Sequence, residues 1–253
     1  MTMYNTVKQK LHEGKQVVGG TIQTPDPDIY RAMAHAGFDF LWIEMQHSPL
    51  TYQDVARMIW AARDAPAIPF IRVPDATEGD IQKAVDVGAL GIIVPMVTSV
   101  AKVEAAVKFA SYPPGGARSQ GAGQYGALWG SDYRRTANDN IMVVGMVESP
   151  EGVEIADQIA AVDGVDVVFV AATDLASFSG LQQGDAEYEA MAVRVRDETL
   201  AAGRKVGGPS AWKGREGYSF FQAPPAEVLV RRGAEALLAE ATSGVAETEG
   251  SER

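Results

Sequence analysis

The sequence predicts a single (β/α)8 barrel domain, an α/β fold, over residues 1–253. Apolar runs of strand length alternate with amphipathic helical patterns along nearly the whole chain, and this alternation repeats eight times, as the barrel requires. No linker or change of composition divides the chain. A doubly wound open sheet is the competing fold. No Gly-x-Gly-x-x-Gly motif follows the first expected strand, which disfavours the dinucleotide-binding form of that sheet.

The first half of the chain contains four strand–helix repeats. Its helices are recognised by an apolar stripe, such as Val55, Met58 and Ile59, or by a glycine after the last turn, such as Gly37. Strands are expected at residues 17–22, 40–46, 68–73 and 91–97, and helices at 27–36, 52–63, 80–87 and 100–110.

The second half is less regular. A long loop rich in Gly, Tyr and Arg is expected at residues 111–140, and only the polar, acidic residues 242–253 follow the last expected strand. The eighth helix is therefore expected to be short or missing. The remaining strands are expected at 141–147, 165–170, 205–210 and 236–241, with an amphipathic helical run that ends at Gly164 and a helix at 188–202.

The composition excludes several classes of function. The 22 basic and 33 acidic side chains give a formal net charge of −11, which repels nucleic acid and anionic membranes. We find neither a membrane-length apolar run nor an N-terminal leader, so the expected location is cytoplasmic. Cysteine is absent, which removes disulfides, thiolate zinc sites and cysteine nucleophiles.

Two carboxylates follow neighbouring strands of the expected barrel. Glu148 comes directly after the strand at 141–147, and Asp174 comes shortly after the strand at 165–170. The C-terminal ends of barrel strands carry the chemistry in this fold, and two oxygen ligands without Cys or His partners suit Mg²⁺ or Mn²⁺. The alternative is that each carboxylate caps the helix that follows it.

Two further residues at strand ends are candidates for catalysis. His47 could act as a general base, since imidazole side chains exchange protons readily near working pH, or it could cap its own loop. Arg72 is a cation inside an apolar strand, where it could grip a substrate carboxylate. Its alternative role is a structural salt bridge to a neighbour such as Glu44.

Three other charged residues have less obvious roles. Asp86 lies on a helix, where position alone predicts no part in catalysis. Arg118 lies in the Gly-rich loop, which could close over a ligand or leave the arginine in solvent. Lys213 follows the seventh strand and is the lysine placed to form a Schiff base, although exposure on the surface is the simpler expectation.

Taken in order, these residues resemble the motifs of the HpcH/HpaI family of metal-dependent pyruvate aldolases. The resemblance extends over roughly residues 15–210. Its motifs are Ile43-Glu-Met-Gln-His47-Ser-Pro, Pro69-Phe-Ile-Arg72-Val-Pro, Val85-Asp86-Val-Gly-Ala, Ile93-Val-Pro-Met-Val97, Tyr112-Pro-Pro-Gly-Gly-Ala-Arg118, Val147-Glu148 and Thr173-Asp174-Leu175.

The resemblance implies a barrel of the phosphoenolpyruvate/pyruvate type, assembled as a homo-oligomer that is usually a hexamer, or trimer of dimers. It implies a divalent metal (Mg²⁺, Mn²⁺ or Co²⁺) held by Glu148 and Asp174. It also implies that His47 and Asp86 form a base dyad. Arg72 would contact the donor's oxygens, and backbone N–H groups at Ala172 and Thr173 would receive the pyruvate carboxylate.

The implied activity is that of a class II aldolase, a carbon–carbon lyase that cleaves or forms 4-hydroxy-2-oxo acids. Pyruvate enolate is the donor and an aldehyde the acceptor, and His47 moves the proton, through a water. Decarboxylation of oxaloacetate or lysis of an acyl-CoA ester could use the same site. A non-catalytic barrel that serves as a binding subunit is the alternative of another class.

Several positions depart from the family pattern. Gln46 stands where an acidic residue often precedes the histidine, Ala171-Ala172 replaces a Gly-Pro pair, and Met146 replaces a glutamine. The segment 212–222 and the C-terminus also diverge. The metal pair, the dyad and Arg72 are all present, so the reaction class is retained while the aldehyde acceptor stays unspecified. Because the eighth helix is expected to be missing, an exchange of that helix between subunits is not assumed.

Overall fold

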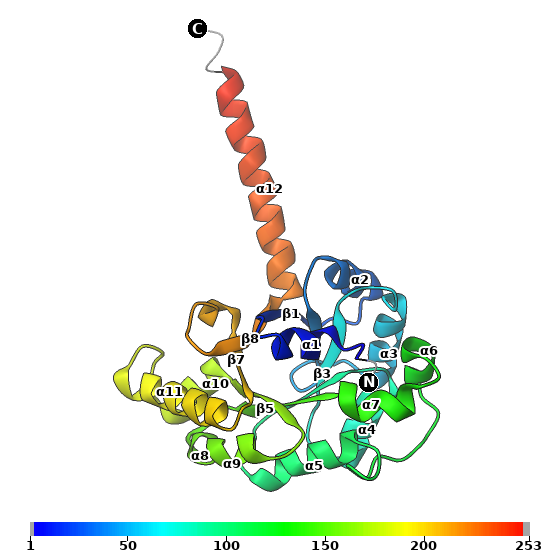
Figure 1. Cartoon of the computed structure of the whole chain (residues 1–253). Helices are drawn as coiled ribbons and strands as arrows, with labels where there is room; N and C mark the ends of the chain where they lie inside the picture. The colour runs from blue at the N-terminus through cyan, green and yellow to red at the C-terminus, as the bar shows by residue number, and fades with distance from the viewer. Residues whose placement is uncertain (1–2, 250–253) are drawn as a thin grey trace.

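A computed structural model of the chain describes residues 3–249, with side chains described up to Ala241. Eight parallel strands form a closed barrel in the order of the sequence, from β1 to β8. Helices surround the barrel and connect its strands (Figure 1). The predicted (β/α)8 architecture is therefore confirmed.

The first seven strands lie where the sequence predicts them, within a few residues at their ends. Most of their residues are buried on both faces, which explains why they read as continuous apolar runs. The strands are β1 Val17–Ile22, β2 Phe40–Glu44, β3 Ile68–Arg72, β4 Gly91–Val94, β5 Met142–Val147, β6 Val165–Val170, β7 Lys205–Pro209 and β8 Tyr218–Pro225.

The helices include some that the sequence patterns do not indicate. The segment 111–140, expected as a loop, contains two short helices, α6 and α7. The helices are α1 Thr6–His12, α2 Pro27–His35, α3 Tyr52–Ala61, α4 Glu78–Asp86, α5 Val100–Ala110, α6 Tyr125–Trp129, α7 Tyr133–Asn140, α8 Pro150–Glu154, α9 Ala156–Ala161, α10 Ala172–Ser179, α11 Ala186–Ala201 and α12 Ala226–Glu249, with a 3₁₀ turn, η1, at Ser210–Trp212.

The prediction for the eighth repeat is wrong. Residues 236–241, expected as the last strand, lie inside α12, and the eighth strand is Tyr218–Pro225. The sequence 236–241 is Ala-Leu-Leu-Ala-Glu-Ala, which consists of strong helix formers, whereas β8 contains an aromatic Phe220-Phe221 pair that favours a strand.

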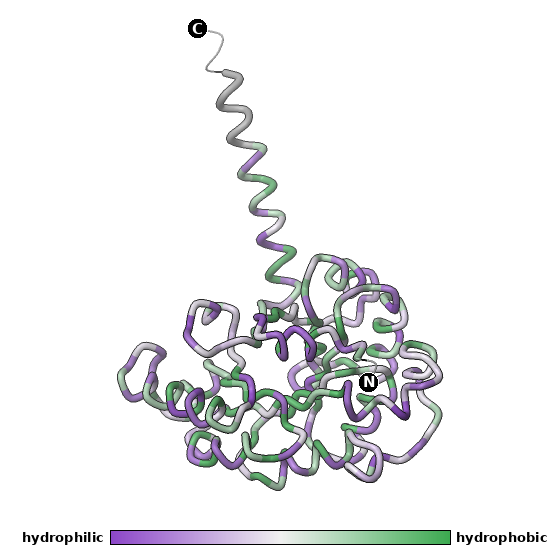
Figure 2. The backbone as a smooth tube through the Cα atoms, viewed as in Figure 1, coloured by the Kyte–Doolittle hydropathy of each residue, from purple (hydrophilic) through white to green (hydrophobic). Residues whose placement is uncertain are grey.

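The expectation of a short or missing eighth helix is also wrong. Helix α12 has 24 residues. It leaves the barrel at the end of β8 and projects away from it rather than folding back over the strands (Figure 1). Hydrophobic and hydrophilic residues alternate along its described length (Figure 2). None of the helices within residues 3–249 combines the length and hydrophobicity that a membrane crossing requires.

Aromatic rings fill the interior of the barrel. The Phe40 ring lies 4.8 Å from that of Phe70 and 4.5 Å from that of Phe220, between centroids. Glycines make room for these rings, since a Cβ atom at Gly19 or Gly91 would lie 2.1 Å from the ring of Phe40 or Phe70 respectively. The barrel is therefore a packed core rather than a pore, and polar chemistry is confined to its ends.

Candidate active site

The C-terminal ends of the strands form the mouth of the barrel, and four of the predicted site residues lie there. Arg72 is the last residue of β3, Glu148 directly follows β5, and Asp174 lies in the first turn of α10, after β6. His47 follows the end of β2 by three residues. A hollow of about 290 Å³ opens at this end, and Arg72 is part of its wall.

Arg72 forms an ion pair with Glu44, which is fully buried. The register of β2 and β3 places the two residues side by side, and Arg72 Nε donates to Glu44 Oε2. Trp42 Nε1 donates to the same oxygen over 3.3 Å. The structural salt bridge that the sequence left as an alternative is therefore present. It fixes the guanidinium at the mouth.

The outer end of the Arg72 guanidinium faces the other strand ends. Its Nη1 atom lies 3.9 Å from the Met146 sulfur and 4.0 Å from Glu148 Oε1. No oxygen of the described residues lies within hydrogen-bond distance of Nη1 or Nη2. The structural salt bridge thus occupies the Nε side of Arg72, and its terminal Nη1 lies toward Glu148.

Glu44 also holds the loop that carries His47. Its second oxygen, Oε1, accepts hydrogen bonds from the backbone N–H groups of Gln46 at 2.8 Å and His47 at 2.9 Å. The imidazole of His47 is exposed at the rim. One buried carboxylate therefore positions both the arginine and the histidine. Sequence reasoning considered Glu44 only as a salt-bridge partner, although a carboxylate that ends an apolar strand is itself a signal.

Asp86 does not lie beside His47 within the chain. It is the last residue of α4, and α4 runs from the C-terminal end of β3 back toward the start of β4. Asp86 is therefore at the opposite end of the barrel from His47, and its carboxylate pairs with Arg118 Nη2 at 2.7 Å. The predicted dyad is not formed inside a single subunit.

Arg118 is neither solvated nor placed over the mouth. Its side chain is buried, and its Nη1 donates to the Tyr133 hydroxyl at 2.9 Å. The guanidinium lies 4.5 Å from the ring centroid of Tyr112 and 5.2 Å from that of Tyr125. The solvated role considered from the sequence is wrong, and Arg118 does not close over the mouth of its own barrel, because three tyrosines and Asp86 hold this cation in place within the 111–140 segment.

Glu148 is the most perturbed acid at the mouth. Its side chain is 2% exposed, and Oε2 accepts a hydrogen bond from Met96 N at 3.0 Å. Its other oxygen, Oε1, is buried and has no hydrogen-bond partner among the described residues. Burial, and then the charge of Asp174, raise the pKa of Glu148 to about 7, against the opposing effect of Arg72.

The capping alternative for the two carboxylates is not what the structure shows. The N-cap of α8 is Ser149, whose hydroxyl accepts from Gly152 N, so Glu148 is not the cap. Helix α10 begins after Ala171 without any side-chain capping bond, although Asp174 lies in its first turn. Neither carboxylate therefore serves as a helix cap.

The backbone strengthens the case that this region is specialised. Met96, whose N–H binds Glu148, has φ of 50°, a left-handed conformation that non-glycine residues rarely adopt. Such strain tends to gather at functional sites. Ala172 and Thr173 are the first residues of α10, and N–H groups at a helix start have no partner inside the helix. They are available to an anion at the mouth.

Glu148 and Asp174 fit a divalent cation. Among residues 3–249 no group of three or more His, Cys, Asp or Glu side chains gathers as a complete metal site. Mg²⁺ and Mn²⁺ need no such cage, since one or two carboxylates with water and substrate oxygens are their usual ligands. The unpartnered Glu148 Oε1 and the repulsion between the two acids are both relieved by a cation between them.

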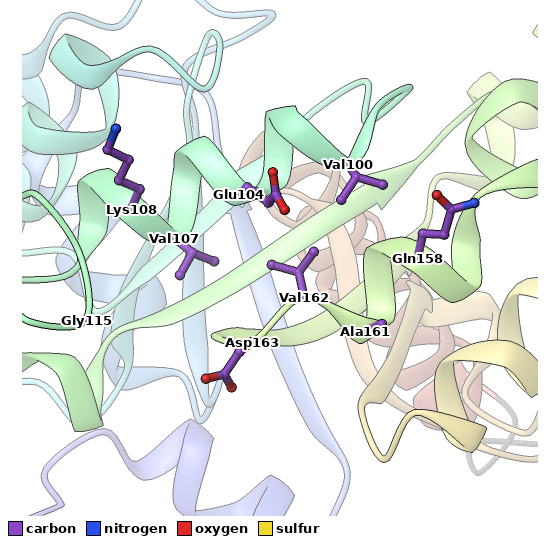
Figure 3. A pocket seen from close by; sticks show the side chains of 9 residues that line it. All are labelled: Val100, Glu104, Val107, Lys108, Gly115, Gln158, Ala161, Val162 and Asp163. Carbon is purple, nitrogen blue, oxygen red and sulfur yellow. The ribbon is translucent and has the colours of Figure 1, made fainter.

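Other features of the surface do not compete with this site. A wider hollow of about 780 Å³ lies outside the barrel between α5 and α9, where the side chains of Glu104, Lys108 and Asp163 surround an apolar floor (Figure 3). The two acids that line it, Glu104 and Asp163, are both exposed, whereas Glu148 at the mouth is buried. Lys213 is exposed and does not line the mouth, which removes the basis for a Schiff base.

Comparison with known proteins identifies the family to which the chain belongs. The family model described as HpcH/HpaI aldolase/citrate lyase matches residues 22–210. The chain belongs to this family. The match runs from the end of β1 to the end of β7 and so contains every site residue described above. Membership confirms the resemblance seen in the sequence motifs.

Relatives of the HpcH/HpaI chain include named aldolases. A hydroxypyruvate/pyruvate aldolase of Rhizorhabdus wittichii is 33% identical over 247 residues, which cover 94% of this chain and 98% of that protein. A 4-hydroxy-2-oxovalerate aldolase of Novosphingobium aromaticivorans is 31% identical over 218 residues, which cover 85% and 82%. The predicted class, an aldolase-type lyase, is confirmed by these similarities.

Solved structures agree on the architecture. An HpcH/HpaI aldolase/citrate lyase family protein from Burkholderia cenocepacia superposes on the chain with a TM-score of 0.86 at 29% identity. The alignment covers 94% of this chain and 99% of that structure.

Proposed function

We propose that the chain is a divalent-metal-dependent aldolase that cleaves or forms 4-hydroxy-2-oxo acids, with pyruvate as donor and an aldehyde as acceptor. The observation that carries this proposal is the buried Glu148 Oε1, which has no hydrogen-bond partner among the described residues, with Asp174 close enough to raise the Glu148 pKa and Arg72 Nη1 at 4.0 Å. The names of the relatives support pyruvate and add hydroxypyruvate as a second donor.

Each residue at the mouth has a definite part in this reaction. A cation held by Glu148 and Asp174 would supply Lewis-acid stabilisation of the negative charge that develops on the donor. Arg72, held from behind by Glu44, directs its two terminal nitrogens to the same developing charge. The N–H groups of Ala172 and Thr173 receive the donor carboxylate.

His47 handles the proton. In cleavage the imidazole accepts the proton of the 4-hydroxyl group, through a water, as the bond between C3 and C4 breaks. In synthesis it takes a proton from the pyruvate methyl group. Its exposed place at the rim keeps the ring in contact with solvent, which restores its protonation state after each turnover.

We further propose that the chain forms a homo-oligomer built from dimers, in which α12 of one subunit packs on a second subunit. Val230 and Leu237 on α12 are 60% and 67% exposed, and their spacing of seven residues places them on one face. Val193 and Leu200 on α11 have the same spacing and are each 41% exposed. Two exposed apolar stripes of equal period are suited to helix–helix packing between copies.

A second copy would also complete the base dyad. Because α4 carries Asp86 to the far end of its own barrel, an Asp86 that orients His47 has to come from another subunit. The proposed dyad is therefore an intersubunit pair.

Chelation tests the proposed chemistry. Pyruvate release from a panel of 4-hydroxy-2-oxo acids should stop in EDTA and return with Mg²⁺, Mn²⁺ or Co²⁺, because the two carboxylates need a cation between them to hold the donor. Turnover that persists in EDTA would contradict the proposal. Oxaloacetate measured on the same enzyme separates decarboxylation from aldol cleavage.

A further inference from the structure

One side of the hollow at the mouth is lined by neutral hydrogen-bonding groups. Gln23 follows β1, Ser210 follows β7, and Gln222 lies in β8. All three side chains are partly buried, and none has a hydrogen-bond partner among residues 3–249. They face the opening at the same end of the barrel as Arg72. Polar groups left unpaired in a partly buried wall favour a ligand that supplies their missing partners.

The same wall offers no free positive charge. Its charged members are Glu44 and Arg72, which form an ion pair, and the terminal nitrogens of Arg72 are assigned to the donor. The nearby Arg215 is paired with Glu189 at 2.6 Å and does not line the hollow. An acceptor that ends in a carboxylate or phosphate would therefore lose its hydration without gaining a cation, which is unfavourable.

The size of the hollow limits the acceptor as well. At about 290 Å³ it is at the lower end of the range for small-molecule sites. Pro224 and Pro225, where β8 ends, give that side of the wall a stiff backbone. A short acceptor fits this space better than a long aliphatic or aromatic one.

We infer that the aldehyde acceptor is a small, uncharged, hydroxylated aldehyde, and that Gln23, Gln222 and Ser210 bind its hydroxyl groups. This inference rests on the aldolase function proposed above. In the synthetic direction C3 of pyruvate loses a proton and forms a bond to the aldehyde carbon, whose oxygen gains a proton. The hydroxyl groups on the rest of the acceptor are then directed to the two amides and the serine.

The first test compares aldehydes of similar length on the metal-loaded enzyme. With pyruvate as donor, kcat/KM should be highest for glyceraldehyde and at least about tenfold lower for propanal, succinic semialdehyde and glyceraldehyde 3-phosphate, because a site that binds hydroxyl groups rejects analogues without them or with uncompensated charge. Equal or better use of either anionic aldehyde would overturn the inference.

Variants of the residues in this wall give a sharper test, because the ratio of kcat/KM for two aldehydes is insensitive to a general loss of activity. Gln23→Leu and Gln222→Leu should each lower the glyceraldehyde-to-propanal ratio of kcat/KM by about 5- to 50-fold, the effect of one or two lost hydrogen bonds. Gln158→Leu, on α9 and outside the hollow, is the matched control and should leave the ratio unchanged. An unchanged ratio in both wall variants contradicts the inference.

A donor-only measurement separates this inference from the proposed function. Exchange of the pyruvate methyl protons with deuterated solvent needs the metal, Arg72 and the His47 base but no acceptor. If the wild-type enzyme shows no metal-dependent exchange, the proposed function fails. If exchange occurs and an anionic aldehyde is preferred, only the acceptor assignment fails. If glyceraldehyde is preferred as expected, Gln222→Lys should raise kcat/KM for succinic semialdehyde, because it adds the cation that this wall lacks.

Discussion

Glu44 connects the candidate catalytic residues at the level of single contacts. One oxygen accepts from Arg72 and Trp42, and the other accepts from the backbone of Gln46 and His47. Both oxygens of a fully buried carboxylate are thereby used inside the protein. Glu44 is a positioning residue: it touches no reacting atom, but it orients the arginine and the histidine loop together.

Glu44→Gln should reduce both activity and stability. The amide keeps the shape but removes the negative charge, which takes the closest counter-charge away from the largely buried Arg72 guanidinium. We expect the free energy of unfolding to fall by about 3 kcal/mol, as when one partner of a buried pair is removed. Urea denaturation measures this. Glu44→Asp, which keeps the charge, should recover part of the loss in pyruvate exchange, and equal losses in both variants would contradict the role.

The residues at the mouth were predictable because of where they stand relative to strands. His47, Arg72, Glu148 and Asp174 end or follow apolar runs, and in a parallel barrel all such positions meet at one end. Asp86 could not be placed in this way. A helix brings its last residue back to the opposite end of the barrel, so similarity of motif places it in the active site only if another subunit supplies it.

At the level of elements, strand patterns were informative up to β7 because each strand is buried on both faces and flanked by a helical pattern. The final repeat departed from this rule. Strand β8 mixes Ser219, Gln222 and two prolines with its aromatic residues, since its C-terminal half lines the mouth. The following helix contains the largely apolar segment 236–241, which has the length of a strand. The polar residues by which β8 lines the mouth, and the exposed apolar residues of α12, obscured the pattern.

Glycine and phenylalanine pairs fix how the strands pack inside the barrel. A Cβ atom on Gly91 would lie 2.1 Å from the Phe70 ring, so Gly91→Ala forces the ring or the strand to move. We expect a loss of about 1–3 kcal/mol in the free energy of unfolding, as for other overpacked cores.

Gly79 on α4 is the matched control, because nothing lies within 4 Å of a Cβ atom built there. Gly79→Ala should be neutral or stabilising by up to about 1 kcal/mol, since alanine is the better helix former. Urea denaturation of both variants checks the comparison. Equal stability of the two alanine variants would show that the packing of the Phe70 ring against Gly91 leaves room for a methyl group.

At the scale of the whole molecule, the projecting helix and the separated dyad point to the same assembly. Helix α12 leaves the barrel with exposed apolar residues, and His47 and Asp86 lie at opposite ends of their own subunit. A contact between subunits would bury these apolar residues and would bring His47 of one subunit beside Asp86 of another. Neither feature was predictable from the periodicity of one chain, because the partner surface is not part of the local pattern.

Mixed oligomers test the intersubunit dyad. His47→Ala and Asp86→Ala should each be inactive alone, and subunits mixed and reassembled in equal amounts should recover about a quarter of wild-type activity, since in a two-fold dimer half the dimers are hybrids with one intact site of two. Leu237→Asp on α12 should reduce assembly, measured by light scattering. Failure to recover activity at any mixing ratio would contradict an intersubunit dyad.

Titration of Mn²⁺ into the metal-free protein tests most directly whether Glu148 and Asp174 hold a divalent cation for aldol chemistry. Wild-type protein and the His47→Ala variant should bind one ion per chain with similar affinity, although the variant should have lost aldol turnover. Glu148→Gln and Asp174→Asn should each bind at least about 100-fold more weakly, because each removes one of two charged ligands. Undiminished Mn²⁺ binding in these two variants, or loss of binding in His47→Ala, would contradict the account.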